Sequence, residues 1–151
     1  MAMTMNGEYE LQVPPQAVWE KLNDAATLKA CIPGCEQLDK TSDTEFQAVA
    51  TVKIGPVKAK FKGRVTLSDL DPPNGYKISG QGDGGVAGFA KGGATVKLAP
   101  KNGGTLLSYN VDAQIGGKLA QLGQRLVNGA AKKIADDFFA NFANAVNPKA
   151  A

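Results

Sequence analysis

The chain has no histidine and only two cysteines among its 151 residues. A nucleophilic triad needs a histidine to act as the base, so none can be assembled here. A structural zinc site needs about four cysteine or histidine ligands, which two cysteines cannot supply. We therefore expect neither a catalytic triad nor a metal centre, and we predict that the protein is not an enzyme.

Long apolar runs and a strong charge are missing as well. No stretch approaches the roughly 18 apolar residues of a membrane span, and the start, MAMTMNGEYELQV, lacks the basic and apolar segments of a secretory signal. The net charge of +3 is too small to indicate nucleic-acid binding. We expect a cytoplasmic protein with one domain over residues 1–151 and a core from about residue 5 to residue 146.

The first 35 residues predict a strand followed by two short helices. Tyr9, Leu11 and Val13 alternate with polar residues, which is typical of a strand. Pro14-Pro15 ends this strand and opens a helix, because proline is tolerated in a first helical turn. Asp24 is placed to cap the second helix, and Pro33 ends it.

The rest of the chain predicts a sheet and one long helix. Residues 36–115 alternate with period two between turns rich in glycine, proline and asparagine, as in an antiparallel meander. Residues 118–146 carry apolar side chains at every third or fourth position, which predicts one continuous helix of ~43 Å. The fold class is therefore α+β: a curved antiparallel sheet of about seven strands wrapped around the C-terminal helix, its only large cover.

The predicted inner face of this sheet has many small residues where a packed core would use bulky ones. Two interpretations are open. In the first, the small residues allow close approach of the helix and sheet backbones or a sharp bend of the sheet. In the second, they leave a cavity between sheet and helix. For the cavity, we predict a lining of Phe46, Ala48, Ala50, Ala59, Phe61, Gly63, Tyr76, Gly80, Phe89, Tyr109, Ala113, Leu119, Gly123 and Leu126.

The two cysteines flank the sequence Cys31-Ile32-Pro33-Gly34-Cys35. The spacing C-x-x-x-C differs from the C-x-x-C of thioredoxin-like redox pairs. A disulfide across a Pro-Gly turn is geometrically conceivable, but thiols in the cytoplasm are usually reduced. We favour an architectural role, since cysteine behaves as a small buried hydrophobe.

A row of cations follows the opposite face of one predicted strand. Alternation places Lys58, Lys60, Lys62 and Arg64 on one outward strip. Such a strip is either a solvated sheet face or a docking surface for anionic lipid or an acidic partner. We keep the docking role as a prediction.

Four segments of the chain resemble the CoxG family, which is named for a subunit of carbon monoxide dehydrogenase. They are Gly7–Tyr9, Pro14–Trp19, Leu28–Glu36 and Lys53–Lys58, of which "CIPGCE" and "KIGPVKAKFKG" are the most specific. The family belongs to the START-related, polyketide-cyclase-like (SRPBCC) superfamily of helix-grip folds. The resemblance spans about residues 5–146 and implies a START-like helix-grip domain that holds an apolar ligand between sheet and helix.

The resemblance also implies a function. Members are associated with a molybdenum-containing carbon monoxide dehydrogenase, as a membrane tether or quinone carrier. We predict a non-catalytic accessory protein that binds a quinone or lipid, associates with a molybdenum hydroxylase such as this dehydrogenase, and links it to the membrane peripherally. One alternative is a ligand-free interaction module that recruits the enzyme. The other is a small cyclase or hydrolase, for which Tyr76 and Tyr109 are the acid–base candidates.

Overall fold

Seven antiparallel strands form one sheet in the computed structural model, which describes residues 1–147. The last four residues of the predicted domain, 148–151, lie outside this range. The sheet order β1-β7-β6-β5-β4-β3-β2 makes a meander from β2 to β7, with the first strand added beside the last. The strands are β1 (Ala2–Leu11), β2 (Cys35–Ser42), β3 (Glu45–Ile54), β4 (Val57–Asp71), β5 (Gly75–Asp83), β6 (Phe89–Lys101) and β7 (Gly104–Gly116).

The residues at the starts of the two short helices explain why these helices begin there. Helix α1 (Pro15–Leu22) starts with a proline in its first turn. Helix α2 (Ala25–Cys31) is capped by Asp24, whose carboxylate accepts a hydrogen bond from the Thr27 N–H at 3.2 Å. A 3₁₀ turn, η1 (Gly85–Ala87), connects β5 to β6. Within residues 1–147, no helix is both long and apolar enough to cross a bilayer.

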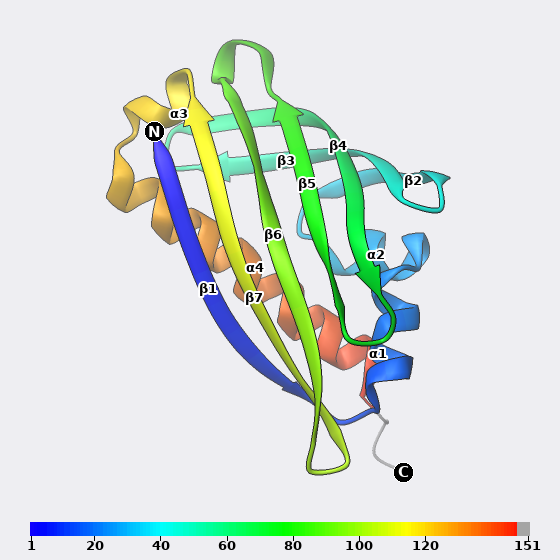
Figure 1. The fold of residues 1–151 in the computed structure, drawn as a ribbon. Coiled ribbons are helices and arrows are strands. Elements are labelled where there is room, and N and C mark those ends of the chain that lie inside the picture. Colours follow the sequence, from blue (N-terminus) through cyan, green and yellow to red (C-terminus); the bar gives the residue numbers. More distant parts are fainter. Residues whose placement is uncertain (148–151) are drawn as a thin grey trace.

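The C-terminal helix runs along the inner face of the curved sheet, with α1 and α2 beside its C-terminal half (Figure 1). This arrangement confirms the predicted α+β class, the seven strands and the two short helices after the first strand. The strands of this curved sheet are long, and β4 alone has 15 residues.

The prediction of one continuous helix over residues 118–146 is wrong. The structure has a four-residue helix, α3 (Lys118–Gln121), and a separate 23-residue helix, α4 (Gln124–Val146). Between them Gly123 has φ +93°, a backbone conformation that residues with a side chain rarely adopt. The apolar spacing continues across the break because Leu119 and Leu122 still pack against the sheet from α3 and its end.

The break at Gly123 can be tested against the continuous helix. If residues 118–146 formed one helix, Gly123→Ala would raise the free energy of unfolding by up to ~1 kcal/mol. With the observed φ, we expect Gly123→Ala to lower it by ~1–3 kcal/mol. Urea denaturation of both proteins measures the difference.

Gly129 provides the matched control for this substitution. It lies inside α4, and a Cβ built at this position meets no atom within 4 Å. Gly129→Ala should therefore gain up to ~1 kcal/mol of stability. Equal stabilisation by the two substitutions would contradict the break.

Candidate functional site

Small residues of five neighbouring strands lie side by side on the inner face of the sheet. Strand pairing brings them together in two adjacent rows, which we call the small-residue band. The rows are Ala48–Gly63–Gly82–Ala90 and Gly80–Gly92–Ala113. The alternation predicted from the sequence therefore has the correct frame on β3, β4, β5 and β7.

The contacts of the glycines show which of them need to be small. A Cβ added at Gly63, Gly80 or Gly82 would find its nearest neighbours on adjacent strands, not on α4. At Gly92 a Cβ would collide with the backbone of β7, so this glycine permits close approach of two strands. Close approach of helix and sheet occurs instead at Gly55, where the Leu126 side chain would lie 2.9 Å from an added Cβ.

The apolar core is divided into two clusters, one toward each end of α4. One contains Phe46, Tyr76, Tyr109 and Phe142, and the other contains Met3, Ile115, Leu119 and Val127. Ala48, Ala50 and Ala59 belong to neither cluster and are only half-buried. The centre of β3 and β4 is therefore less completely covered than the two ends of the helix.

A groove of about 740 Å³ lies between α4 and β3. We call it the α4–β3 groove. Val52 and Ile54 contribute its sheet side, while Leu126 and Ile134 contribute its helix side with 41% and 36% of their surface exposed. Gly129 also lines it and has open space where a side chain would stand. The cations that line the groove are Lys53, Arg125 and Lys133.

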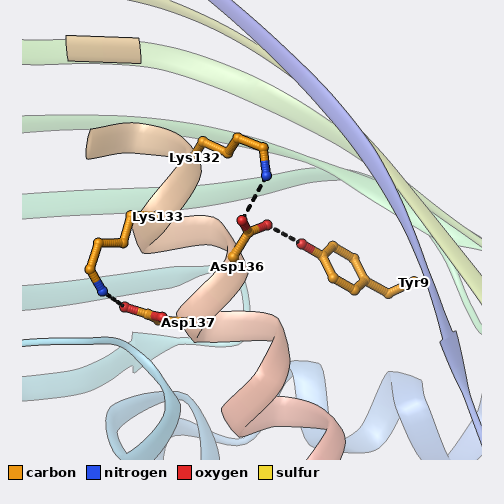
Figure 2. A network of polar contacts seen from close by, with 5 residues as sticks. All are labelled: Tyr9, Lys132, Lys133, Asp136 and Asp137. Atoms are coloured by element: carbon orange, nitrogen blue, oxygen red, sulfur yellow. Dashed lines mark hydrogen bonds and ion pairs between the residues drawn. The ribbon is translucent and has the colours of Figure 1, made fainter. Parts of the chain in front are cut away.

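Helix α4 is held on the opposite side, against β1 and β7. The Phe139 ring stacks on Tyr9 and Tyr109 with centroids 4.4 Å and 5.1 Å away. The Tyr9 hydroxyl donates a 2.6 Å hydrogen bond to Asp136, which also pairs with Lys132 at 2.7 Å (Figure 2). The contacts of Phe139 and Asp136 hold one side of α4 against β1 and β7. The opposite side of α4 faces the α4–β3 groove.

This network shifts the ionisation of its members. Burial, followed by the hydrogen bond to Asp136, raises the pKa of Tyr9 above its ordinary value of 10.0. The hydrogen bond from Lys132, followed by that from Tyr9, lowers the pKa of Asp136. Lys133 and Asp137, one residue further along α4, form a separate ion pair at 2.8 Å (Figure 2). Both pairs join residues four apart on α4, whereas the contact of Asp136 with Tyr9 joins residues that no local pattern relates.

The predicted cavity residues occupy several different places. Four of them, Phe46, Tyr76, Tyr109 and Leu119, are buried in the two core clusters. Leu126 lines the α4–β3 groove, and Gly123 separates α3 from α4. The remaining inner-face residues of the prediction, which the structure leaves half-buried, are Ala48, Ala50, Ala59, Phe61, Gly63, Gly80 and Ala113. That they enclose a ligand stays a prediction.

Phe89 was placed on the wrong face of the sheet. Ala90 faces inward opposite Ile115, so alternation turns Phe89 outward, where 44% of its surface is exposed. Its ring lies next to Gly116 on the outer face. The alternation of β6 already assigns Phe89 to the face opposite Ala90.

Neither tyrosine named as an acid–base candidate has the environment of an efficient acid or base. Burial raises the pKa of Tyr76, whose ring packs edge-on against Trp19. Burial also raises the pKa of Tyr109, followed by the charge of Asp136. Both phenols are therefore neutral at physiological pH and hold their protons more tightly than free tyrosine does.

The two cysteines are free thiols that flank a tight turn. Cys31 is buried at the end of α2, and its carbonyl accepts a 3.0 Å hydrogen bond from the Asn141 side chain on α4. Gly34 has φ +74°, as a Pro-Gly turn requires. Burial raises the pKa of both thiols. Among residues 1–147, no group of three or more His, Cys, Asp or Glu side chains could hold a metal ion.

The predicted basic strip is partly neutralised. Lys60 pairs with Glu36 at 3.2 Å, and Arg64 pairs with Glu45 at 3.3 Å. Lys58 and Lys62 form no ion pair with the part of the chain that the structure describes. Two of the four cations of the strip could therefore contact a docking partner. Docking by the strip stays a prediction.

The family model of the carbon monoxide dehydrogenase subunit CoxG matches residues 7–147, which is nearly the whole chain. The chain belongs to the CoxG family. A solved structure of a conserved protein from Geobacillus kaustophilus is similar at 34% identity and a TM-score of 0.89, with 95% of each chain covered. No curated protein matches this CoxG chain.

More distant structures share the fold of this CoxG protein. One is Ara h 8.0201, at 14% identity and a TM-score of 0.69 over 97% of this chain and 98% of the other. Another is the Zhui aromatase/cyclase from Streptomyces sp. R1128, at 11% identity and a TM-score of 0.70 over 97% and 94%. These neighbours confirm the helix-grip fold that the sequence resemblance implies.

The Tyr9–Asp136 contact should make stability depend on pH at both extremes. A group with a raised folded pKa stabilises the fold fully below its unfolded value and loses this contribution above it. For Tyr9 the loss begins as the pH rises through about 10. Asp136, with a lowered pKa, loses its contribution as the pH falls through the acid range. Tyr9→Phe should flatten the alkaline loss, as measured by urea denaturation across pH.

Asp136 and Asp137 form a matched pair for testing this contact at neutral pH. Within residues 1–147, the hydrogen bond and ion pair of Asp137 are both with Lys133, so Asp137→Asn should change the urea midpoint less than Asp136→Asn does. In a Tyr9→Phe background the effect of Asp136→Asn should shrink, because the two side chains are coupled. Strict additivity of the two substitutions would argue against a tether between β1 and α4.

Proposed function

We propose that this CoxG-family protein binds a quinone or lipid between its sheet and α4. In this role it is a non-catalytic accessory protein of a molybdenum hydroxylase such as carbon monoxide dehydrogenase, which it links to the membrane. The observation that supports the proposal is the α4–β3 groove, where apolar side chains of helix and sheet face each other without covering one another. Family membership supports the association with the dehydrogenase.

The size and chemistry of the groove suit such a ligand. Ligand sites commonly measure about 300–1,000 Å³ and are lined by apolar residues with a few polar groups. The groove, at about 740 Å³, falls within this range. Leu126 and Ile134 would each lose exposed apolar surface to a bound hydrocarbon, at about 25 cal/mol per Å². Lys53 and Arg125 stand where a polar head group would meet them.

The groove adjoins the half-buried small residues of β3 and β4. Val52 and Ile54 of the groove continue the inner-face row that contains Ala48 and Ala50. Ala48 and Ala50 belong to neither core cluster, so an apolar chain that entered between α4 and β3 and extended along β3 would meet them. Small side chains on this path are consistent with a ligand that extends inward from the groove.

Substitution at Gly129 tests the groove without disturbing the core. Gly129→Leu places a side chain in open space that the groove provides, and it also removes a helix-interior glycine. We expect the ligand-free protein to keep or gain up to ~1 kcal/mol of stability. Binding of decylubiquinone and of oleate, measured by isothermal titration calorimetry, should fall at least tenfold.

Gly129→Ala is the matched control, because it improves the helix but leaves most of the groove empty. It should bind both probes like the unmodified protein. Mass spectrometry of organic extracts of the purified protein should also detect a quinone or lipid. Unchanged probe binding by Gly129→Leu, or no binding by the unmodified protein, would favour the ligand-free interaction module.

A further inference from the structure

Three large apolar side chains are exposed at one end of the molecule. Val86, in the η1 turn, has 85% of its surface exposed, followed by Phe89 at 44% and Leu126 at 41%. The η1 turn is tied to α3, because the backbones of Gly88 and Gly117 touch. Figure 1 shows the β5–β6 connection, α3 and the start of β1 at this same end. We call this surface, together with the β3–β4 turn beside Leu126, the α3 end.

Cations surround these apolar side chains. Lys62 and Lys91 line a hollow together with Val86 and Phe89, while Lys53 and Arg125 line the α4–β3 groove together with Leu126. Two more stand nearby: Lys58 directly opposite Lys53 in the β3–β4 hairpin, and Lys118 at the start of α3. None of the six forms an ion pair within residues 1–147.

Several acidic side chains lie away from the α3 end. Glu8 and Glu10 lie toward the far end of β1, and Asp69 and Asp71 lie at the β4–β5 turn. The hollow beside Val86 and Phe89 is also lined by two acids, Asp39 and Asp83, and the Asp83 carboxylate accepts a 2.8 Å hydrogen bond from the Gly85 N–H. Around the exposed apolar residues, the six cations that form no ion pair within residues 1–147 thus outnumber these two acids.

We propose that the α3 end docks onto an anionic lipid bilayer, with Val86 entering the head-group region and the six cations facing the lipid phosphates. This inference rests on the membrane link in the proposed function and specifies the surface that makes it. Each cation near an anionic bilayer strengthens partitioning by about fivefold. Lys58 and Lys62 belong to the predicted basic strip, but the surface extends across α3 and η1 rather than along β4.

The geometry favours a bilayer over an acidic protein. Val86 and Phe89 line one hollow, while Leu126 lines the separate α4–β3 groove, so the exposed apolar side chains are divided between two places instead of forming the single apolar centre typical of a protein interface core. A fluid head-group layer can receive side chains that stand apart in this way. Leu126 and Arg125 also line the α4–β3 groove, so docking at the α3 end would turn the groove toward the lipid.

Sedimentation of the full chain with vesicles tests the docking surface. We expect binding to phosphatidylcholine vesicles that contain phosphatidylglycerol, little binding to phosphatidylcholine alone, and loss of binding at high salt as charges are screened. Val86→Asp should weaken partitioning at least fivefold, and Lys118→Glu with Arg125→Glu should weaken it more than tenfold. These side chains are exposed, so the variants should fold normally.

Matched controls lie at the other end of the molecule. Leu70→Asp changes an apolar side chain that is 41% exposed near the β4–β5 turn. Lys97→Glu with Lys21→Glu reverses the same number of charges on β6 and α1. Both controls should retain vesicle binding within about twofold. An equal loss in test and control variants would overturn the proposal, as would the absence of binding to phosphatidylglycerol vesicles by the unmodified protein.

Docking and ligand binding can fail separately. Val86→Asp should still bind decylubiquinone, and Gly129→Leu should still sediment with anionic vesicles. If the unmodified protein ignores all vesicles but binds an acidic protein through Lys118 and Arg125, the surface belongs to a protein partner and the bilayer proposal is wrong.

Discussion

One asymmetric contact fastens α4 to the β1 side of the sheet. Tyr9 of β1 stacks on Phe139 and donates a hydrogen bond to Asp136, two interactions that fasten the helix to the β1 side of the sheet. Residues on the other side of α4, such as Leu126 and Ile134, then have no equivalent partner on β3. The groove is thus a consequence of where the helix is held. A helix seated centrally over the sheet would leave less apolar surface uncovered beside β3.

The small-residue band follows from two different requirements. Gly92 must be small because the β7 backbone passes close to it, which is a constraint of sheet shape. Gly63, Gly80 and Gly82 meet no comparable obstruction, and α4 does not provide their nearest neighbours. Close approach of two strands therefore accounts for Gly92. That the other glycines line a ligand cavity stays a prediction.

Much of the fold could be predicted from the chain because its local signals agree with one another. Alternation, turn residues and the Pro14-Pro15 and Asp24 helix starts all specify the same order of elements. The break at Gly123 could not be seen, since apolar spacing reports which side of a segment is covered and not whether its backbone is continuous. Glycine is also tolerated within helices, so the presence of Gly123 alone did not show whether the helix is continuous.

The site was harder to predict because it depends on contacts between distant residues. Tyr9 and Asp136 are 127 positions apart, and no local pattern relates them. The alternation of the sequence correctly assigned small residues to the inner face on several strands. Which of these residues are covered depends on the position of α4 over the sheet. The pairing of Lys60 with Glu36 likewise depends on how β2 and β4 are brought near each other by β3.

The pairing of β1 with β7 has a consequence for how the protein comes to be folded. During synthesis, β1, α1 and α2 leave the ribosome first. At that time β7, which hydrogen-bonds to β1, and α4, which covers the apolar sides of these elements, have not yet been made. The intervening strands can pair as successive hairpins, but β1 has only this late partner in the sheet. A contact of such long sequence separation closes slowly. The amino-terminal segment is thus the part of the nascent chain whose apolar residues stay exposed longest, and the part most dependent on protection before release.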